Sequence, residues 1–308
     1  MKKKLISIIK KSVIVLLILS IFSFIISCII FHKHLARPTY SPMKLEYINR
    51  GRNYFESLNA QEVVFNAQDG IRLSGVLVPN EQAKRIVIIC HGFQASKEMM
   101  SDCVQALYDN ETIFFLFDFR AHGSSQGSYI SLAYHEKKDL YAAVNFLKSQ
   151  ENIKHLPLYA IGVSMGGAVL LSTASELLVF EGLVIDSTFA DIEQQLIRSF
   201  KQKTNLPLFP FIHILRFIFE YIHGVSMLQL SPQLIINKID VPILFIHSRD
   251  DAVTPFHEGQ FLFNSKKGTK DFWKVESAKH AHIFRQFPEH YREKVTQFFL
   301  SIENSIKE

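Results

Sequence analysis

The stretch YAIGVSMGGAVL, residues 159–170, decides the fold of this 308-residue chain. It is an apolar run that stops at glycines packed around one serine, Ser164, and then resumes as an apolar run of small residues. An ordinary loop favours Asn, Asp or Pro, and an ordinary helix start favours a capping residue rather than glycines on both sides. The composition therefore indicates that the backbone is forced into a tight turn at Ser164.

Gly162, Ser164 and Gly166 match the pattern G-x-S-x-G. In this pattern a strand turns sharply into a helix, and the serine is held in a strained conformation with its hydroxyl exposed. Side chains at Gly162 and Gly166 would collide with neighbouring backbone, and Gly167 leaves room for close helix packing. The context fits, because a predicted strand at Leu158–Val163 precedes the serine and a helical pattern follows it. Ser164 is therefore the candidate nucleophile.

Short apolar runs alternate with helical patterns on both sides of this stretch. Glu62–Phe65 and Ile71–Val78 predict a hairpin around Asp69-Gly70. His135–Lys148 and Glu289–Ile302 each keep one apolar face and predict helices. Further strands are predicted at Arg85–Cys90, Thr112–Phe119, Leu158–Val163, Leu183–Ile185, Val241–His247 and Phe272–Val275. This alternation predicts a mainly parallel sheet covered by helices on both faces, with ligands bound at the carboxyl ends of the strands.

The lysines and the long apolar stretch within residues 1–37 predict a basic cytoplasmic segment followed by a membrane anchor. Ser12–Phe31 is uncharged and has about the length needed to cross a ~30 Å hydrocarbon layer. Five lysines precede it and only Lys33 and Arg37 follow closely, so the positive-inside rule places the N-terminus in the cytoplasm and the rest outside it. A cleaved signal peptide is the main alternative, and Cys28 also resembles a bacterial lipoprotein processing site.

The composition describes a folded body without excess cations. Apolar residues make up 48% of the chain, which is ample for a buried core. The formal charge is +5, but seven Lys and Arg lie within residues 1–37, so the remainder carries −2. This balance argues against nucleic acid as a partner. Cys28, Cys90 and Cys103 have no paired spacing, which argues against disulfides and zinc, and Cys90 is expected to be a small buried apolar residue.

A serine hydroxyl is a weak nucleophile near neutral pH. It needs a base that takes its proton and a third group that fixes the tautomer of that base, and both should lie at later strand ends. One predicted strand ends at Asp250 and Asp251, and the last ends shortly before His280 and His282. Asp186, which follows an earlier strand, is a further candidate acid.

Taken together, these segments resemble the α/β-hydrolase superfamily of serine hydrolases over nearly all of the chain after the anchor. The matching strand-end segments are CHGFQAS at 90–96, FDFRAHGSS at 117–125, GVSMGG at 162–167, HSRDDAVTP at 247–255 and SAKHAH at 277–282. Serine, aspartate and histidine also follow one another in the order expected for this fold. The resemblance is to the branch with membrane-anchored esterases, lysophospholipases and peptidases, and it implies a hydrolase domain at 38–308.

The resemblance also implies which acid and which base complete a catalytic triad. The family pattern H-G-x-x-D-x-V-x-P favours Asp251 over Asp250, with Ser248 in place of the usual glycine. The final family motif places the histidine directly after a short turn, which favours His280 over His282.

Two backbone N–H groups should meet the oxyanion that forms during acyl transfer. The resemblance points to Met165, directly after the nucleophile, and to Phe93 in the loop after His91. His91 and His122 are expected to have structural roles, and Ala121 stands where the family commonly has glycine.

Between residues 187 and 238 the alternation breaks. About fifty residues of helical pattern follow the sixth strand, where α/β-hydrolases keep a small cap. In this segment the spacing of the polar residues predicts one polar stripe on an otherwise apolar helix, formed by His213, Arg216, Glu220 and His223. The helix is expected either to pack on the core or to form a lid that faces an acyl chain or the bilayer.

The sequence thus predicts an α/β-hydrolase fold with a helical cap and an N-terminal transmembrane helix. The expected activity is serine hydrolysis of carboxylic esters with lipid-like acyl chains, bound as small-molecule or lipid substrates. A peptidase of the same fold is the nearest alternative, and a non-catalytic binding scaffold is the alternative of another class. No metal motif, dinucleotide fingerprint or Walker lysine is present in the sequence, so no metal and no cofactor are expected. The oligomeric state stays open.

Overall fold

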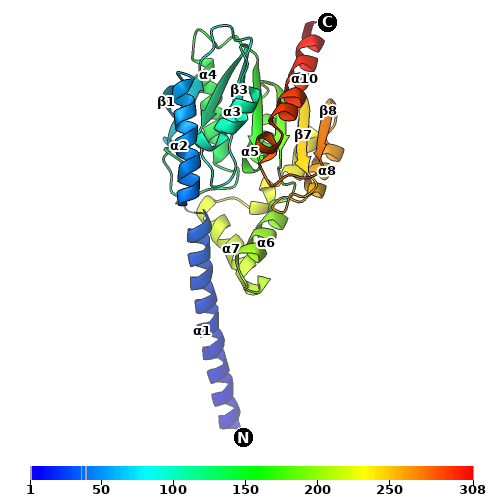
Figure 1. Ribbon diagram of the computed structural model, residues 1–308. Coiled ribbons are helices and arrows are strands. Elements are labelled where there is room, and N and C mark those ends of the chain that lie inside the picture. The colour runs from blue at the N-terminus through cyan, green and yellow to red at the C-terminus, as the bar shows by residue number, and fades with distance from the viewer. Residues whose placement is uncertain (1, 36, 39, 308) are drawn as a thin grey trace.

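An eight-stranded sheet forms the centre of the computed structural model, which describes residues 2–35, 37–38 and 40–307 (Figure 1). Its strands are β1 Gln61–Asn66, β2 Arg72–Val78, β3 Arg85–Cys90, β4 Thr112–Phe117, β5 Leu158–Val163, β6 Phe180–Asp186, β7 Ile243–Ser248 and β8 Lys270–Val275. They lie in the order β1-β2-β4-β3-β5-β6-β7-β8. The pairs β1–β2 and β2–β4 are antiparallel and all other neighbours are parallel, so the prediction of a mainly parallel sheet is confirmed.

Helices cover both faces of the sheet, as predicted. One face carries α2 Pro42–Ser57, α3 Ser101–Leu107, α9 Ile283–Gln286 and α10 Pro288–Lys307. The other carries α4 Glu136–Lys148, α5 Met165–Ala174 and α8 Phe256–Ser265. Each face has its own cluster of buried apolar side chains, and every residue of β3, β4 and β5 is buried. Burial on both faces explains why these strands are continuous apolar runs rather than alternating ones.

The helix α1 Lys2–Leu35 projects away from the domain (Figure 1). It contains the predicted span Ser12–Phe31 and is long and apolar enough to cross a membrane, by the same measure that a signal sequence also meets. Its large apolar side chains up to Ile25 are exposed, whereas Phe31 and Leu35 near its end are buried.

The segment that follows α1 contains a helix that the sequence analysis missed. This helix, α2, begins at Pro42. Ser41 caps it, because the Ser41 hydroxyl oxygen accepts a hydrogen bond from the N–H of Lys44 at 3.4 Å. The apolar pattern of α2 is sparse, because it buries only Ile48, Gly51 and Phe55. A helix that buries so few of its residues leaves a weak periodic signal.

The residues between β6 and β7, here called the insert, form α6 Ile192–Lys203 and α7 Leu208–His223, followed by three short 3-10 turns. In Figure 1 both helices extend beyond the sheet at the end from which α1 projects, and α7 contacts α1. This arrangement brings α1 next to the part of the chain that departs from the strand–helix alternation.

The four polar residues of α7 differ in burial, although their spacing places them on one side of the helix. His213 is exposed, but His223 is buried, where its ring lies 5.5 Å from the ring of His135. Arg216 is half-buried and pairs with Glu193 of α6 at 3.2 Å. The polar side chains of α7 therefore have different neighbours, and α7 itself packs against α6 and α1.

Candidate active site

The turn at Ser164 has the strained geometry that its glycines predict. Ser164 has φ 55° and ψ −117°, a conformation that costs about 1–3 kcal/mol and persists only where its surroundings enforce it. A Cβ atom at Gly162 would lie 2.6 Å from Cα of Gly167, and one at Gly166 would lie 2.3 Å from the carbonyl oxygen of Cys90. Strand β5 and helix α5 therefore meet at a distance that only glycine permits.

The carboxyl ends of the parallel strands meet at one edge of the sheet. The strand register pairs Cys90 with Gly162, Val163 with Asp186 and Ser248 with Val275. The strand order also reverses between the neighbours β3 and β5, which is the kind of point where open α/β sheets bind ligands. Ser164 follows β5 directly at this point.

Three of the predicted residues, each after a different strand, form a continuous chain of hydrogen bonds. Nε2 of His280 lies 2.9 Å from Oγ of Ser164, and Nδ1 of His280 lies 2.7 Å from Oδ2 of Asp251. When Nδ1–H donates to the carboxylate, Nε2 is left as the acceptor for the serine hydroxyl. The ring is thus held in the tautomer that can remove the serine proton.

Asp251 is held as a carboxylate. Burial opposes its ionisation, but hydrogen bonds from His280 and from the backbone N–H groups of Thr254 and Val253 hold its pKa below the usual value. Those N–H groups lie 2.8 and 2.9 Å from Oδ1, and the Thr254 hydroxyl lies 3.0 Å from Oδ2. A charged, fixed carboxylate can stabilise the imidazolium that forms when His280 accepts a proton.

The alternative acids and the alternative base point elsewhere. Asp250 is exposed, and Nδ1 of His282 donates to the carbonyl oxygen of His280 at 2.7 Å. Asp186 is buried, and its Oδ1 accepts from the hydroxyl of Ser187 at 2.8 Å. Burial raises the pKa of Asp186 to about 7. The geometry therefore favours Asp251 and His280 over these three residues.

Ser248 has a role that sequence reasoning did not assign. Its hydroxyl oxygen accepts from the N–H of Ala278 at 2.8 Å and from the N–H of Asp250 at 3.2 Å. It therefore ties the loop that carries Asp251 to the loop that carries His280. The only signal in the sequence was the departure from the glycine that the family usually has at this position.

The two predicted oxyanion donors lie beside the serine. Met165 is the first residue of α5, where a backbone N–H has no acceptor within the helix. Phe93 follows Gly92 in the loop after β3, and a Cβ atom at Gly92 would lie 3.3 Å from Cβ of Ser164. Met165, Phe93 and Ser164 all line one cavity. Both residues therefore border the cavity at Ser164.

His91 and His122 support this loop from inside the protein, as expected. Nε2 of His91 accepts from the N–H of Phe119 at 3.1 Å, and Nε2 of His122 accepts from the N–H of Gln94 at 3.1 Å. The second nitrogen of each ring donates to a backbone carbonyl. Burial lowers the pKa of His91 to about 4 and that of His122 to about 3, so both rings are neutral and structural.

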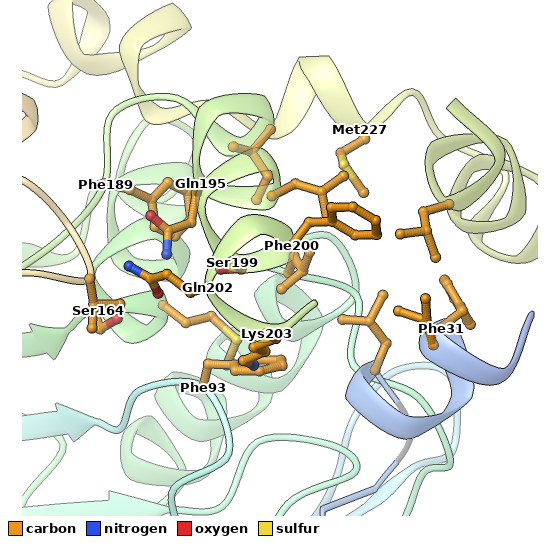
Figure 2. Close-up of a pocket in the computed structure, with 18 of the residues that line it drawn as sticks. Phe31, Phe93, Ser164, Phe189, Gln195, Ser199, Phe200, Gln202, Lys203 and Met227 are labelled. Atoms are coloured by element: carbon orange, nitrogen blue, oxygen red, sulfur yellow. The ribbon is translucent and has the colours of Figure 1, made fainter. Parts of the chain in front are cut away.

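A cavity of about 290 Å³ extends from Ser164 and His280 into the insert (Figure 2). Its walls are mostly apolar, and Figure 2 shows Ser164 at one end and Phe31 of α1 at the other. Among the residues described as lining it there is no carboxylate, and the one cationic side chain is that of Lys203, which lies over the ring of Phe93 at 5.7 Å. Within the described ranges, no group of three or more His, Cys, Asp or Glu could hold a metal ion.

Known proteins are similar to this chain in sequence and in fold. Residues 81–232 match the family model described as "Serine aminopeptidase, S33". The uncharacterized protein YqkD of Bacillus subtilis is 29% identical over 83% of this chain and 86% of its own length. A protein described as thiohydrolase aneE, from Aspergillus aculeatus, is 27% identical over 58% of this chain and 64% of its own length.

A solved structure of the esterase Pf2001 of Pyrococcus furiosus is 25% identical and has a TM-score of 0.68. It covers 88% of this chain and 98% of its own chain. The family model, the relatives and this structural likeness support a hydrolase. Together they support a member of the α/β-hydrolase superfamily, and the structure has the fold of that superfamily.

Proposed function

We propose that this protein is a serine hydrolase that cleaves carboxylic esters through an acyl-enzyme on Ser164. The observation that carries the proposal is the unbroken chain of contacts from Oγ of Ser164 through both nitrogens of His280 to Asp251. The same contacts speak against a non-catalytic scaffold, because nothing about a binding surface requires a strained serine aligned on an imidazole.

The geometry supports a two-step reaction. In the first step Oγ of Ser164 bonds to the acyl carbon while Nε2 of His280 takes the hydroxyl proton, and the N–H groups of Met165 and Phe93 hold the oxyanion. The ester C–O bond then breaks, and His280 gives its proton to the departing alcohol. In the second step water, deprotonated by His280, attacks the acyl carbon. The bond from that carbon to Oγ of Ser164 then breaks, His280 returns the proton to Oγ, and the acid is released. Asp251 keeps its negative charge throughout and stabilises the imidazolium.

The cavity favours esters over peptides as substrates. A peptidase that removes N-terminal residues must neutralise the α-ammonium group of its substrate, and burying that charge without a partner is costly. No carboxylate lines the cavity among the residues that the structure describes there, and Lys203 would repel a cation. The match to a family model named for aminopeptidases keeps a peptidase as the second candidate.

A substrate profile of the full-length protein in detergent tests this choice. We expect Ser164-dependent hydrolysis of p-nitrophenyl acyl esters with kcat/KM at least about a hundredfold above that for aminoacyl p-nitroanilides. Acyl thioesters belong in the same panel, because one relative is described as a thiohydrolase. A preference for aminoacyl anilides would replace the esterase with the peptidase.

We also infer that α1 is an uncleaved anchor for residues 38–308, and that residues 187–238 act as a cap over the site. The uncharged stretch of α1 and the lysines before it favour an N-terminus in the cytoplasm and a catalytic domain outside it. Alkaline extraction of membranes, followed by N-terminal sequencing of the protein, tests the anchor. Recovery of a chain that begins after residue 31 in the soluble fraction would contradict it.

A further inference from the structure

The substrate cavity and the membrane helix share side chains. Ile30, Phe31 and Leu35 of α1 line the same cavity as Ser164 and His280. In Figure 2 the end of α1 closes the cavity at the side opposite the serine. The walls between them come from the insert, through Phe189, Ile192, Leu196, Phe200, Leu215 and Met227. The anchor is therefore part of the binding site and not only a tether.

One face of α1 carries this contact. Phe31 and Leu35 are buried, whereas Phe24, Ile25 and Ile29 are 46, 50 and 61% exposed. The buried positions continue one turn earlier at Ser27, whose small side chain lets neighbouring backbone approach closely and whose hydroxyl donates to the carbonyl of Ser23 at 2.9 Å. Residues four apart lie on the same side of a helix, so the last turns of α1 present a continuous strip to the insert.

Backbone hydrogen bonds fasten the end of α1 to the domain. The N–H of Ile130 donates to the carbonyl of Leu35 at 2.8 Å, and the N–H of Arg37 donates to the carbonyl of Ser128 at 2.9 Å. The Arg37 guanidinium also donates to the carbonyl of Gly123 at 2.9 Å. These bonds fix how deep the domain sits relative to the helix.

That depth places the cavity at the edge of the bilayer. Ser12–Phe31 lies between the charges of Lys11 and Lys33, and its twenty residues rise about 30 Å, the thickness of a hydrocarbon core. Ile30 therefore lies at the outer boundary of the hydrocarbon, and the insert packed against it lies at the same level.

The outer side of α7 is suited to this position. Phe209, Phe217 and Tyr221 are 76, 59 and 81% exposed, and the rings of Phe217 and Tyr221 stack 6.2 Å apart. Aromatic side chains of this kind are enriched where protein meets the membrane–water interface. The bilayer that holds α1 is thus the surface that covers this side of α7.

We propose that α1 and the insert together form an acyl-chain site that is filled from the bilayer. The substrate is a membrane lipid with a long acyl ester, whose chain lies along Ile30, Phe31 and Leu35 while its carbonyl reaches Ser164. This inference rests on the proposed esterase function, and it makes the membrane helix a determinant of chain length. No new bond-making step is involved, because the reaction stays the acyl transfer described above.

Two neighbouring isoleucines of α1 give a matched test. Ile30 lines the cavity, whereas Ile29 is on the exposed face of the same helix. In full-length protein, I30W should lower the ratio of kcat/KM for p-nitrophenyl palmitate to that for p-nitrophenyl butyrate at least about tenfold. I29W should leave this ratio within about twofold of the wild-type value.

The outcomes separate the two proposals. If Ser164-dependent butyrate hydrolysis is present and I30W leaves the ratio as I29W does, the acyl site on α1 is refuted while the esterase stands. If the wild type hydrolyses neither ester, both proposals fall. Should I30W not fold, I30A serves instead, and it should shift the preferred ester towards longer chains; an unchanged preference would refute the site.

Entry from the bilayer has its own measurement. The chain has one tryptophan, Trp273, so a W273F background allows a single new tryptophan at Phe217 or, as control, at Leu178. Leu178 is 84% exposed and precedes β6, at the sheet edge opposite to Ser164. In phosphatidylcholine vesicles, dibrominated acyl chains should quench F217W strongly and L178W hardly at all. Equal, weak quenching of both would place α7 away from the membrane and overturn this route of entry.

Discussion

The edge of the sheet at Ser164 and the insert above it are built by different forces. At the sheet edge, Ser164, His280 and Asp251 are held by hydrogen bonds of 2.7 to 2.9 Å and by a backbone turn that excludes any side chain at its glycines. The insert and the end of α1 instead meet through apolar side chains around a cavity of about 290 Å³. Directional contacts fix the reacting atoms, and non-directional contacts shape the space beside them.

This difference assigns chemistry to one region and selection of substrate to the other. Changes to the side chains that hold the reacting atoms at the sheet edge should lower turnover or stability, because a misplaced donor or acceptor is costly. Changes in the insert should alter which acyl chain is accepted, because apolar packing tolerates substitutions of similar volume. The following predictions separate the two regions, beginning with the largest effect.

The largest effect is expected at the carboxylate. D251N should lower kcat about ten-thousandfold, because an amide cannot hold the His280 ring in the correct tautomer or stabilise its charge. D250N should change kcat less than about threefold, because Asp250 is exposed. Ester hydrolysis by the two variants, with circular dichroism to verify folding, checks this. The reverse order of effects would move the triad acid to Asp250.

Two glycines compare the regions in stability. G166A should lower the free energy of unfolding by at least about 3 kcal/mol, because the added Cβ would lie 2.3 Å from the backbone oxygen of Cys90. G224A, at the end of α7, should lower the free energy of unfolding by only about 1 kcal/mol. The backbone at φ 68° is unfavourable for alanine, but no atom lies within 4 Å of the added Cβ. Chemical denaturation in detergent measures both. Equal effects would mean that the turn at Ser164 is not tightly packed.

Acid should loosen the sheet edge through its buried histidines. A histidine side chain in the unfolded protein has a pKa of about 6.5. In the folded protein, burial lowers the pKa of His91 to about 4 and that of His122 to about 3. The unfolded state therefore binds more protons below pH 6.5, and stability falls as the pH decreases, by up to about 1.4 kcal/mol per pH unit for each ring.

Replacement of His122 tests this pH dependence. H122Q should flatten the slope of unfolding free energy between pH 6 and pH 4 by about 1.4 kcal/mol per pH unit. Denaturation at a series of pH values measures these slopes. An unchanged slope in H122Q would show that His122 is protonated in the folded state.

The smallest effect is expected at Ser248. S248A removes the acceptor for the buried N–H of Ala278, which should cost about 1–3 kcal/mol of stability and reduce kcat about tenfold by loosening the loop of His280. S248G, which introduces the residue common in the family, should behave similarly in this chain. Turnover equal to wild type in both variants would show that the two loops are held independently of Ser248.

The sequence allowed the sheet edge and the presence of a helical insert to be predicted, but not how that insert packs. The strands and the turn at Ser164 follow from local patterns, because short motifs impose the backbone geometry there. The choice of Asp251 and His280 over their neighbours came from the resemblance of their segments to the family motifs. The contact of α1 with α7 joins residues nearly two hundred positions apart, and apolar packing of that kind leaves no local pattern. The burial of His223 beside His135 and the hydrogen bond from Ala278 to Ser248 also join residues far apart in the sequence, and α2 buries too few side chains to leave a clear periodic pattern.

The most direct test of the account is whether Ser164 becomes covalently modified in the folded protein. Full-length protein in detergent is treated with an alkyl fluorophosphonate and analysed by intact mass and peptide mapping. We expect one adduct per chain on the peptide that contains Ser164, no adduct in S164A, and labelling at least about a hundredfold slower in H280Q. Absence of an adduct on the folded wild type, or an equal adduct in S164A, would contradict the account.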